Sequence, residues 1–200
     1  MYVVQLLCMF CAVCVCLSRD VPFEWSYCNG KSKVIKIKNL KIWPTPLKSP
    51  GKFYVDFDEE TTQTLNSSRI EIKVKKLGFI DLPVPCITNF GSCTYPDSCT
   101  VLNEMEKYDY GGLMGPISQT IKKMFDDNGV VHKCPVPPQK FSVKQAEFSL
   151  PKTSRIMKRF LKGNFEAQVR MIDNGNKAEF FCMKFRISVD TGCTGWFCFR

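Results

Sequence analysis

The reactive side chains of this sequence are its cysteines, its single histidine and two acidic clusters. Catalysis by a hydroxyl or thiol group needs a base beside the nucleophile and a further group that orients the base. His132 is the one imidazole that could serve as this base, and it stands beside Lys133 in an expected loop. A histidine in such a loop is usually solvated. No nucleotide-binding or acyl-transfer motif occurs, so nothing places a nucleophile near it.

The acidic clusters suggest a second chemistry, because glycosidases use a pair of carboxyl groups. Asp58-Glu59-Glu60 and Asp126-Asp127 both stand where we expect turns, and a carboxylate in a turn is usually solvated. Sequence patterns alone do not reveal a glycosidase pair, so an enzyme remains the alternative. We expect a binding protein without catalytic residues.

The amino terminus decides how the cysteines are interpreted. Residues 1–17 carry no charged side chain, and Ser18 follows them, with Cys16 two positions before it. Small residues at these two positions are typical of a signal-peptidase site. The apolar run is also short for a membrane span. We predict a signal peptide at 1–18, with an uncleaved anchor as the alternative, and one exported domain at 19–200.

Export makes disulfide bonding the expected state of the remaining cysteines. Four of the 12 cysteines belong to the predicted signal peptide, which leaves an even number. An even number of cysteines in an exported chain indicates disulfides. No pair among them has the C-x2-C spacing of structural zinc sites, so we expect neither a metal nor a cofactor. These cysteines are Cys28, Cys86, Cys93, Cys99, Cys134, Cys182, Cys193 and Cys198.

The exported chain is basic. The formal net charge is +9, and every Lys and Arg follows the predicted signal peptide. Such a charge favours anionic partners, an acidic membrane surface among them. Nucleic acid is not an expected partner, because no nucleic-acid-binding motif is present. A polar loop at 59–68 contains a glycosylation sequon at Asn66, which we expect to be exposed.

Alternating apolar and polar residues predict antiparallel strands with one wet face. The alternation runs through 34–43, where its phase shifts before Leu40 and indicates a bulge, and through 52–58 and 69–77. A further strand is expected around 145–151. The apolar residues that this pattern turns inward include Phe53, Val55, Phe57, Ile70, Ile72 and Val74.

The clearest hairpin of the sequence lies in its last third. It joins 163–173 to 177–189 through Asn174-Gly175-Asn176. Its inward residues include Phe165, Val169, Phe181 and Phe185. Residues 115–125 instead have helical spacing, which predicts a short amphipathic helix that packs on the sheet. The expected fold is all-β, an antiparallel sandwich or cup with one or two short helices.

Five segments, in order, resemble one protein family. They are FEWSYC, PCITNFGSCTYPDSC, CPVPPQKFSVKQAEFSLPK, KGNFEAQVRM and FFCMKFRIS, and together they extend over roughly residues 23–189. This order is similar to that of the ganglioside-activator family, which belongs to the lipid-recognition (ML) superfamily. The resemblance implies a β-cup whose inward residues, listed above, line an apolar cavity for lipid acyl chains.

The resemblance also implies bonding and partners. It pairs Cys28 with Cys182, Cys86 with Cys93, and Cys99 with Cys134. Cys193 and Cys198 lie in a tail at 190–200 outside the family pattern, and we pair them with each other. The implied role is non-enzymatic: a glycolipid or other membrane lipid is bound, and the partner enzyme is a lysosomal glycosidase such as β-hexosaminidase.

Two segments combine apolar and basic residues in the way that membrane docking requires. Leu77, Phe79 and Ile80 follow Lys73, Lys75 and Lys76. Phe160 and Leu161 stand among Lys158, Arg159 and Lys162. The alternative is that both are strand ends packed on the core.

The sequence thus favours a secreted or lysosomal protein that extracts glycolipids such as gangliosides from membranes and activates a glycosidase by presenting them. One alternative keeps the fold but carries other lipids or hydrophobic signals without an enzyme partner. Another is a disulfide-rich secreted ligand of a receptor.

Overall fold

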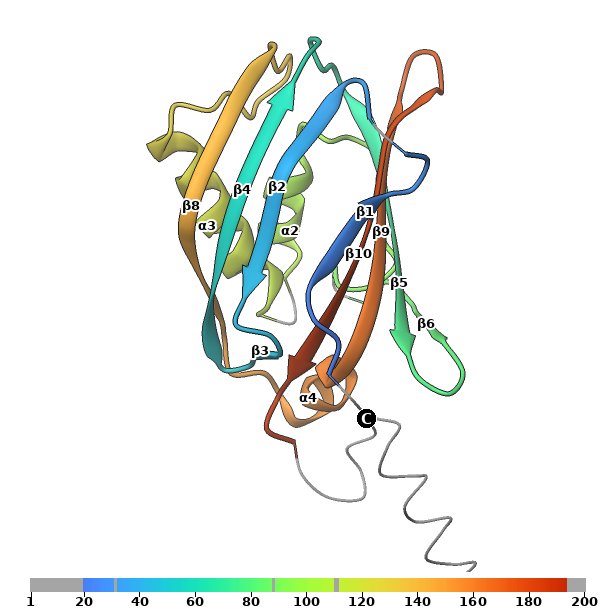
Figure 1. Cartoon of the computed structure of the whole chain (residues 1–200), viewed down its shortest axis with the longest axis vertical. Coiled ribbons are helices and arrows are strands. Elements are labelled where there is room, and N and C mark those ends of the chain that lie inside the picture. The colour runs from blue at the N-terminus through green and yellow to red at the C-terminus, as the bar shows by residue number, and fades with distance from the viewer. Residues whose placement is uncertain (1–19, 31, 88, 110–111, 194–200) are drawn as a thin grey trace, which may run out of the picture.

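Two sheets face each other in the computed structural model, which describes residues 20–193 except 31, 88 and 110–111 (Figure 1). The larger sheet has the order β1-β10-β9-β5-β6, with β3 paired to β10 and β7 to β5. Its strands are β1 (Glu24–Tyr27), β3 (Leu47–Lys48), β5 (Ser68–Leu77), β6 (Leu82–Val84), β7 (Thr94–Tyr95), β9 (Gly163–Asp173) and β10 (Glu179–Asp190). The smaller sheet has the order β2-β4-β8, formed by β2 (Ile35–Trp43), β4 (Gly51–Thr61) and β8 (Gln139–Leu150). The predicted all-β sandwich or cup is confirmed.

The predicted hairpin is β9 and β10. Phe165 pairs with Ile187 and Val169 with Met183, so their apolar side chains share one face. The Asp173 carboxylate accepts hydrogen bonds from the backbone N–H groups of Gly175 and Asn176, at 2.8 and 2.9 Å, and these bonds close the turn. Local turn chemistry therefore fixes the register of the two central strands.

The predicted bulge is present, but strand β4 is longer than the sequence indicated. The pairing of β2 with β4 shifts register between Ile37 and Asn39. β4 continues to Thr61, so Glu59 and Glu60 belong to a strand. The expectation that these two carboxylates stand in a turn is wrong, because cross-strand hydrogen bonding extends the ladder beyond the apolar run.

Three helices are described: α2 (Val101–Lys107), α3 (Met114–Asp127) and α4 (Arg155–Leu161). α3 is the predicted amphipathic helix, and Met114, Ile117 and Met124 pack on the core. It begins where the Asp109 carboxylate accepts bonds from backbone N–H groups, the shortest 2.7 Å from Gly115. One or two short helices were expected, and the described residues contain three.

Three disulfides follow the pairing implied by the family resemblance. Cys28–Cys182, Cys86–Cys93 and Cys99–Cys134 are bonded, so these assignments are confirmed. Cys193 is also disulfide-bonded, but its predicted partner, Cys198, lies outside the described residues. The predicted signal peptide at 1–18 lies outside them as well.

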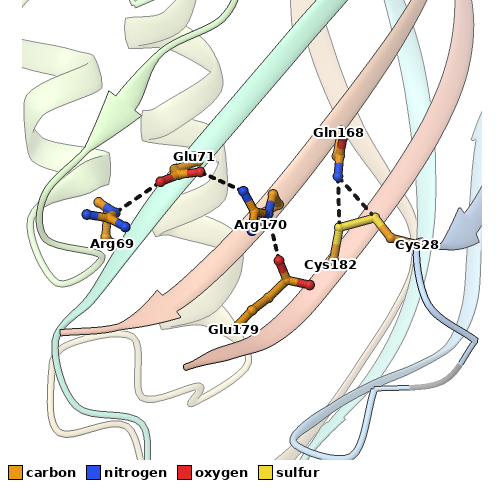
Figure 2. A network of polar contacts seen from close by, with 7 residues as sticks. All are labelled: Cys28, Arg69, Glu71, Gln168, Arg170, Glu179 and Cys182. Carbon is orange, nitrogen blue, oxygen red and sulfur yellow. Dashed lines mark hydrogen bonds and ion pairs between the residues drawn. A yellow bond between two sulfur atoms is a disulfide. The ribbon is translucent and has the colours of Figure 1, made fainter. Parts of the chain in front are cut away.

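The outer face of the larger sheet carries a polar network around the first of these disulfides (Figure 2). Arg170 donates to Glu179 at 2.6 Å and to Glu71 at 3.0 Å, which links β9 to β10 and β5. Gln168 donates to a sulfur of Cys182 at 3.2 Å. Polar groups are thus paired on the outside, while the apolar residues of the same strands face the second sheet.

We predict that the Cys28–Cys182 bond stabilises the fold more than Cys86–Cys93 does. The bonds span 154 and 7 residues. In the chain-entropy description these loops correspond to about 5 and about 2.5 kcal/mol. Replacing each pair by Ser and measuring the free energy of unfolding in urea should show the larger loss for Cys28 and Cys182. Equal losses, or the reverse order, would contradict this.

Candidate functional site

The space between the two sheets is lined by the apolar side chains that the sequence analysis singled out. In the larger sheet, Ile72 pairs with Val169 and Val74 with Ala167, so one face of the sheet is apolar. In the smaller sheet, Phe53 pairs with Phe148 and Val55 with Ala146. Seven of the predicted lining residues fall in two apolar clusters between the sheets: Phe53, Val55, Val74, Phe165 and Phe185 in one, Phe57 and Phe181 in the other. The other three, Ile70, Ile72 and Val169, lie on the same face by register.

This lining is only partly closed. Phe53, Phe165 and Phe181 are buried. Ile70, Ile72 and Val169, on the central strands β5 and β9, keep part of their surface accessible. Side chains in the middle of a close-packed core would be buried. The sheets therefore do not close completely over these residues.

Helix α3 covers one side of the interior. Its apolar face contributes Met114, Ile117, Ile121 and Met124 to the larger cluster. Phe125 packs edge-on against Phe141 of β8, with ring centroids 5.4 Å apart. The helix therefore lies against strand β8.

His132 packs against this helix. Its ring stacks on Phe125 with a centroid distance of 5.6 Å, and Nδ1 lies 3.7 Å from the Asp126 carboxylate. The expectation of a solvated loop histidine is wrong, because the following Cys99–Cys134 bond ties this loop to α2 and holds the ring on the helix. Its Nδ1 also lies 3.4 Å from the Val130 carbonyl oxygen.

One acid faces the interior. Glu59 pairs with Ile37 on one side and with Phe141 on the other, and both neighbours are buried core residues. Paired residues of adjacent strands point to the same face, so the Glu59 carboxyl lies on the apolar side of the sheet. The Thr61 hydroxyl donates a hydrogen bond to Glu59 Oε1 at 2.8 Å. No other polar partner of this carboxyl is found within the described residues.

The surroundings of Glu59 favour its neutral form. Burial raises the pKa of its carboxyl, and the hydrogen bond from Thr61 offsets this in part. The neighbouring Glu60 faces outward, where a hydrogen bond and ion pair with Lys38 at 2.7 Å lower the pKa of its carboxyl. The sequence analysis did not place Glu59 on the inner face, although the alternation of inward residues Phe53, Val55 and Phe57 continues to it.

The second candidate surface is one end of the molecule, where the β5–β6 loop and α4 lie (Figure 1). The Lys76 ammonium donates to the Arg159 carbonyl at 3.4 Å, which joins the two segments. Phe79 and Ile80 in the loop are 97% and 70% exposed, and Ile156 and Phe160 of α4 are 67% and 50% exposed. We call these four residues the apolar tip.

Two of the residues expected in this surface are less accessible than the sequence pattern indicated. Leu161 is 4% exposed and belongs to the core cluster, so it cannot reach a membrane, and Leu77 is half-buried. The helical turn of α4 accounts for Leu161, because it places Leu161 and Phe160 on different faces. Ile156, which sequence analysis did not name, takes its place at the tip.

Basic residues adjoin the apolar tip. Lys73 and Lys75 of β5 and Arg159 of α4 are exposed. Lys76 is partly buried, and burial followed by the charge of Lys162 lowers the pKa of its ammonium group. No described helix is long and apolar enough to cross a membrane.

Two facing, mostly antiparallel sheets with apolar side chains between them are the arrangement of a β-sandwich or β-cup domain. The chain belongs to the ML domain family, whose model matches residues 22–189. A relative in mouse, Ganglioside GM2 activator, is 25% identical over 176 residues, covering 86% of this chain and 84% of the relative.

The chain is also similar to a second relative and to a solved structure. The Ganglioside GM2 activator of Macaca fascicularis is 25% identical over 137 residues, covering 68% of this chain and 67% of the relative. The crystal structure of a Niemann-Pick type C2 protein from Japanese carpenter ant superimposes with a TM-score of 0.40 at 14% identity, covering 84% of this chain and 99% of that one.

We predict opposite pH responses for two adjacent substitutions. When folding raises the pKa of a carboxyl group, the free energy of unfolding falls as the pH rises from the unfolded-state pKa through the folded-state pKa. Glu59→Gln removes this loss, so the variant should be more stable than wild type near neutral pH, and the difference should vanish below about pH 4.5.

Glu60→Gln is the matched control. Because folding lowers the pKa of Glu60, its carboxylate stabilises the fold at every pH above the unfolded-state pKa of the group. The Glu60→Gln variant should therefore be less stable than wild type near neutral pH and as stable as wild type in strong acid. Urea unfolding across the pH range measures both effects. A Glu59→Gln variant that is destabilised at neutral pH would show that the carboxylate is well solvated.

Proposed function

We propose that the protein is an exported lipid carrier that takes glycolipids, gangliosides among them, out of membranes in the secretory pathway or the lysosome. One observation carries this proposal: an apolar tip with basic neighbours stands at the end of a partly open apolar interior. The tip supplies a means of docking, and the interior supplies a place for acyl chains.

The apolar interior would offset the main energetic cost of taking a lipid out of a membrane. Moving a lipid from bilayer to water costs about 0.8 kcal/mol per CH2, on the order of 20 kcal/mol for two long chains. A carrier must therefore replace the bilayer with an apolar surface of its own. The half-buried Ile70, Ile72 and Val169 offer such a surface without requiring that the core unfold.

Docking proceeds in two steps. Each Lys or Arg near an anionic surface contributes about 1 kcal/mol, and this attraction fades beyond a Debye length of about 8 Å at physiological salt. Lys73, Lys75 and Arg159 provide this approach. Insertion follows, because Phe79 and Phe160 already present exposed apolar surface.

The glycolipid class and the enzyme partner rest on likeness to relatives. The relatives are named Ganglioside GM2 activator, at 25% identity. We infer that this chain is also non-enzymatic and passes its lipid to a glycosidase such as β-hexosaminidase. Adding the protein to that enzyme and a membrane-embedded ganglioside should raise the hydrolysis rate, and no effect would leave the chain a carrier without this partner.

We predict that Phe79→Ser with Ile80→Ser slows lipid extraction. Burying each side chain in the membrane contributes roughly 1.5–3 kcal/mol, so their loss should weaken insertion strongly. The electrostatic approach should remain, and it should weaken with added salt in both proteins. Transfer of a fluorescent glycolipid between vesicles, beside a vesicle sedimentation assay, separates the two steps.

Val131→Ser is the matched control for this experiment. Val131 is also exposed, at 44%, but lies beyond α3 and outside the apolar tip. It should transfer lipid at the wild-type rate. If the Phe79 and Ile80 variant also kept the wild-type rate, the tip would have no part in extraction. If wild type itself moved no lipid, the proposed function would fall.

A further inference from the structure

Among the described residues, the acid Glu59 faces the interior at the end remote from the apolar tip. Phe53 shares a core cluster with Leu161 of α4, so it marks the end of the interior beside the tip. Strand β4 runs from there to the opposite end of the molecule (Figure 1). Glu59 stands near the far end of this strand, on the same face as Phe53.

The dimensions match those of a lipid chain. From Phe53 to Glu59 the strand rises about 20 Å at about 3.3 Å per residue. The acyl chains of one leaflet fill about 15 Å, half of the hydrocarbon core of a bilayer. A long chain that enters from the tip therefore extends most of the way to the Glu59 carboxyl, whereas a short chain stops well before it.

We propose that Glu59 makes the binding of long-chain lipids proton-linked: its carboxyl takes up a proton as an acyl chain fills the interior, so acid tightens binding. This inference rests on the proposed function. An arriving chain displaces water from around the carboxyl, and a charged carboxylate loses more solvation free energy than a neutral acid. Binding and protonation then favour each other by linkage.

The contacts of Glu59 are compatible with both the protonated and the ionised form of its carboxyl group. Thr61 donates to Oε1, and this bond persists when the proton resides on Oε2. No cation faces the carboxyl from the described parts of β2, β4 or β8, whose charged residues near it lie on the outer face. These residues are Lys36, Lys38, Asp58, Glu60, Lys140 and Lys144.

Other described elements around this end contribute titratable groups of their own. The Tyr27 hydroxyl of β1 is bonded to the backbone of Ile37. His132 stacks on Phe125, which in turn packs on Phe141. On α3, Lys122 is paired with Glu106 and Lys123 with Asp127. The facing residues of the larger sheet that complete the smaller cluster are apolar: Met171, Phe181 and Met183.

The test uses the full exported chain and uncharged ligands, so that neither the lipid nor its membrane titrates. Galactose monoesters with one stearoyl or one hexanoyl chain, which carry no second hydrocarbon chain, are bound in solution, and dissociation constants are measured between about pH 4 and about pH 8. For one coupled proton the affinity for the stearoyl lipid should change by up to about tenfold per pH unit. The hexanoyl lipid should show a much flatter profile.

Four variants separate this acid from other groups. Glu59→Gln should flatten the stearoyl profile, while Glu60→Gln and His132→Ala should keep the wild-type slope. Thr61→Val should move the midpoint of the profile to higher pH, since it removes the hydrogen bond that favours the carboxylate. This shift serves as a second test in case Glu59→Gln folds poorly.

The outcomes distinguish the two proposals. Equal slopes for wild type and Glu59→Gln, or equal slopes for the two lipids, would overturn the role of Glu59 while leaving a lipid carrier. A wild-type affinity independent of pH would do the same. Failure of wild type to bind the stearoyl lipid at any pH would overturn the carrier, and this inference with it.

Discussion

Both sheets have one apolar face that must be covered without the two sheets collapsing onto each other. Close packing favours collapse, because any empty apolar space loses its van der Waals contacts. Bonds at the edges of the sheets fix their strands in place. Cys28–Cys182 fastens β1 to β10, and the Tyr27 hydroxyl of β1 binds the backbone of Ile37 across the gap between sheets. Helix α3 covers the other side of the interior. The edges are thereby fixed in place while the centre stays partly open.

Much of the fold could be predicted from sequence. In a strand with one solvent-exposed face, apolar and polar residues alternate, so the sequence shows which side chains point toward the core. The β9–β10 hairpin, the bulge in β2 and the apolar face of α3 all follow from local pattern and turn chemistry. The disulfide pairing is different, since cysteine spacing alone permits many connectivities. It came from the family resemblance, and the bonded pairs agree with it.

Candidate-site residues were less predictable where long-range contacts override local pattern. The expected turn at Glu59 fails because β2 and β8 extend the β4 ladder on both sides. Leu161 and Phe160 are adjacent in sequence, and only the helical turn of α4 sends one inward and the other out. The pattern of basic and apolar residues could not reveal that two distant segments meet at one end; the contact between Lys76 and Arg159 does that.

The two ends of the interior differ in a way that suits a carrier. A uniformly apolar interior would favour loading and oppose release to the same degree, because the same buried area governs both. A carboxyl at the far end breaks this symmetry. Its protonation adds a contribution to the lipid-binding free energy that depends on pH and on how deeply the chain enters. The affinity of the apolar tip for membranes is unchanged by this contribution. Under the two proposals, entry would be controlled by Phe79 and Phe160, which are exposed at one end, and retention by Glu59 near the other end of β4. A lipid could in this way be held in one compartment and given up in another without any change in fold.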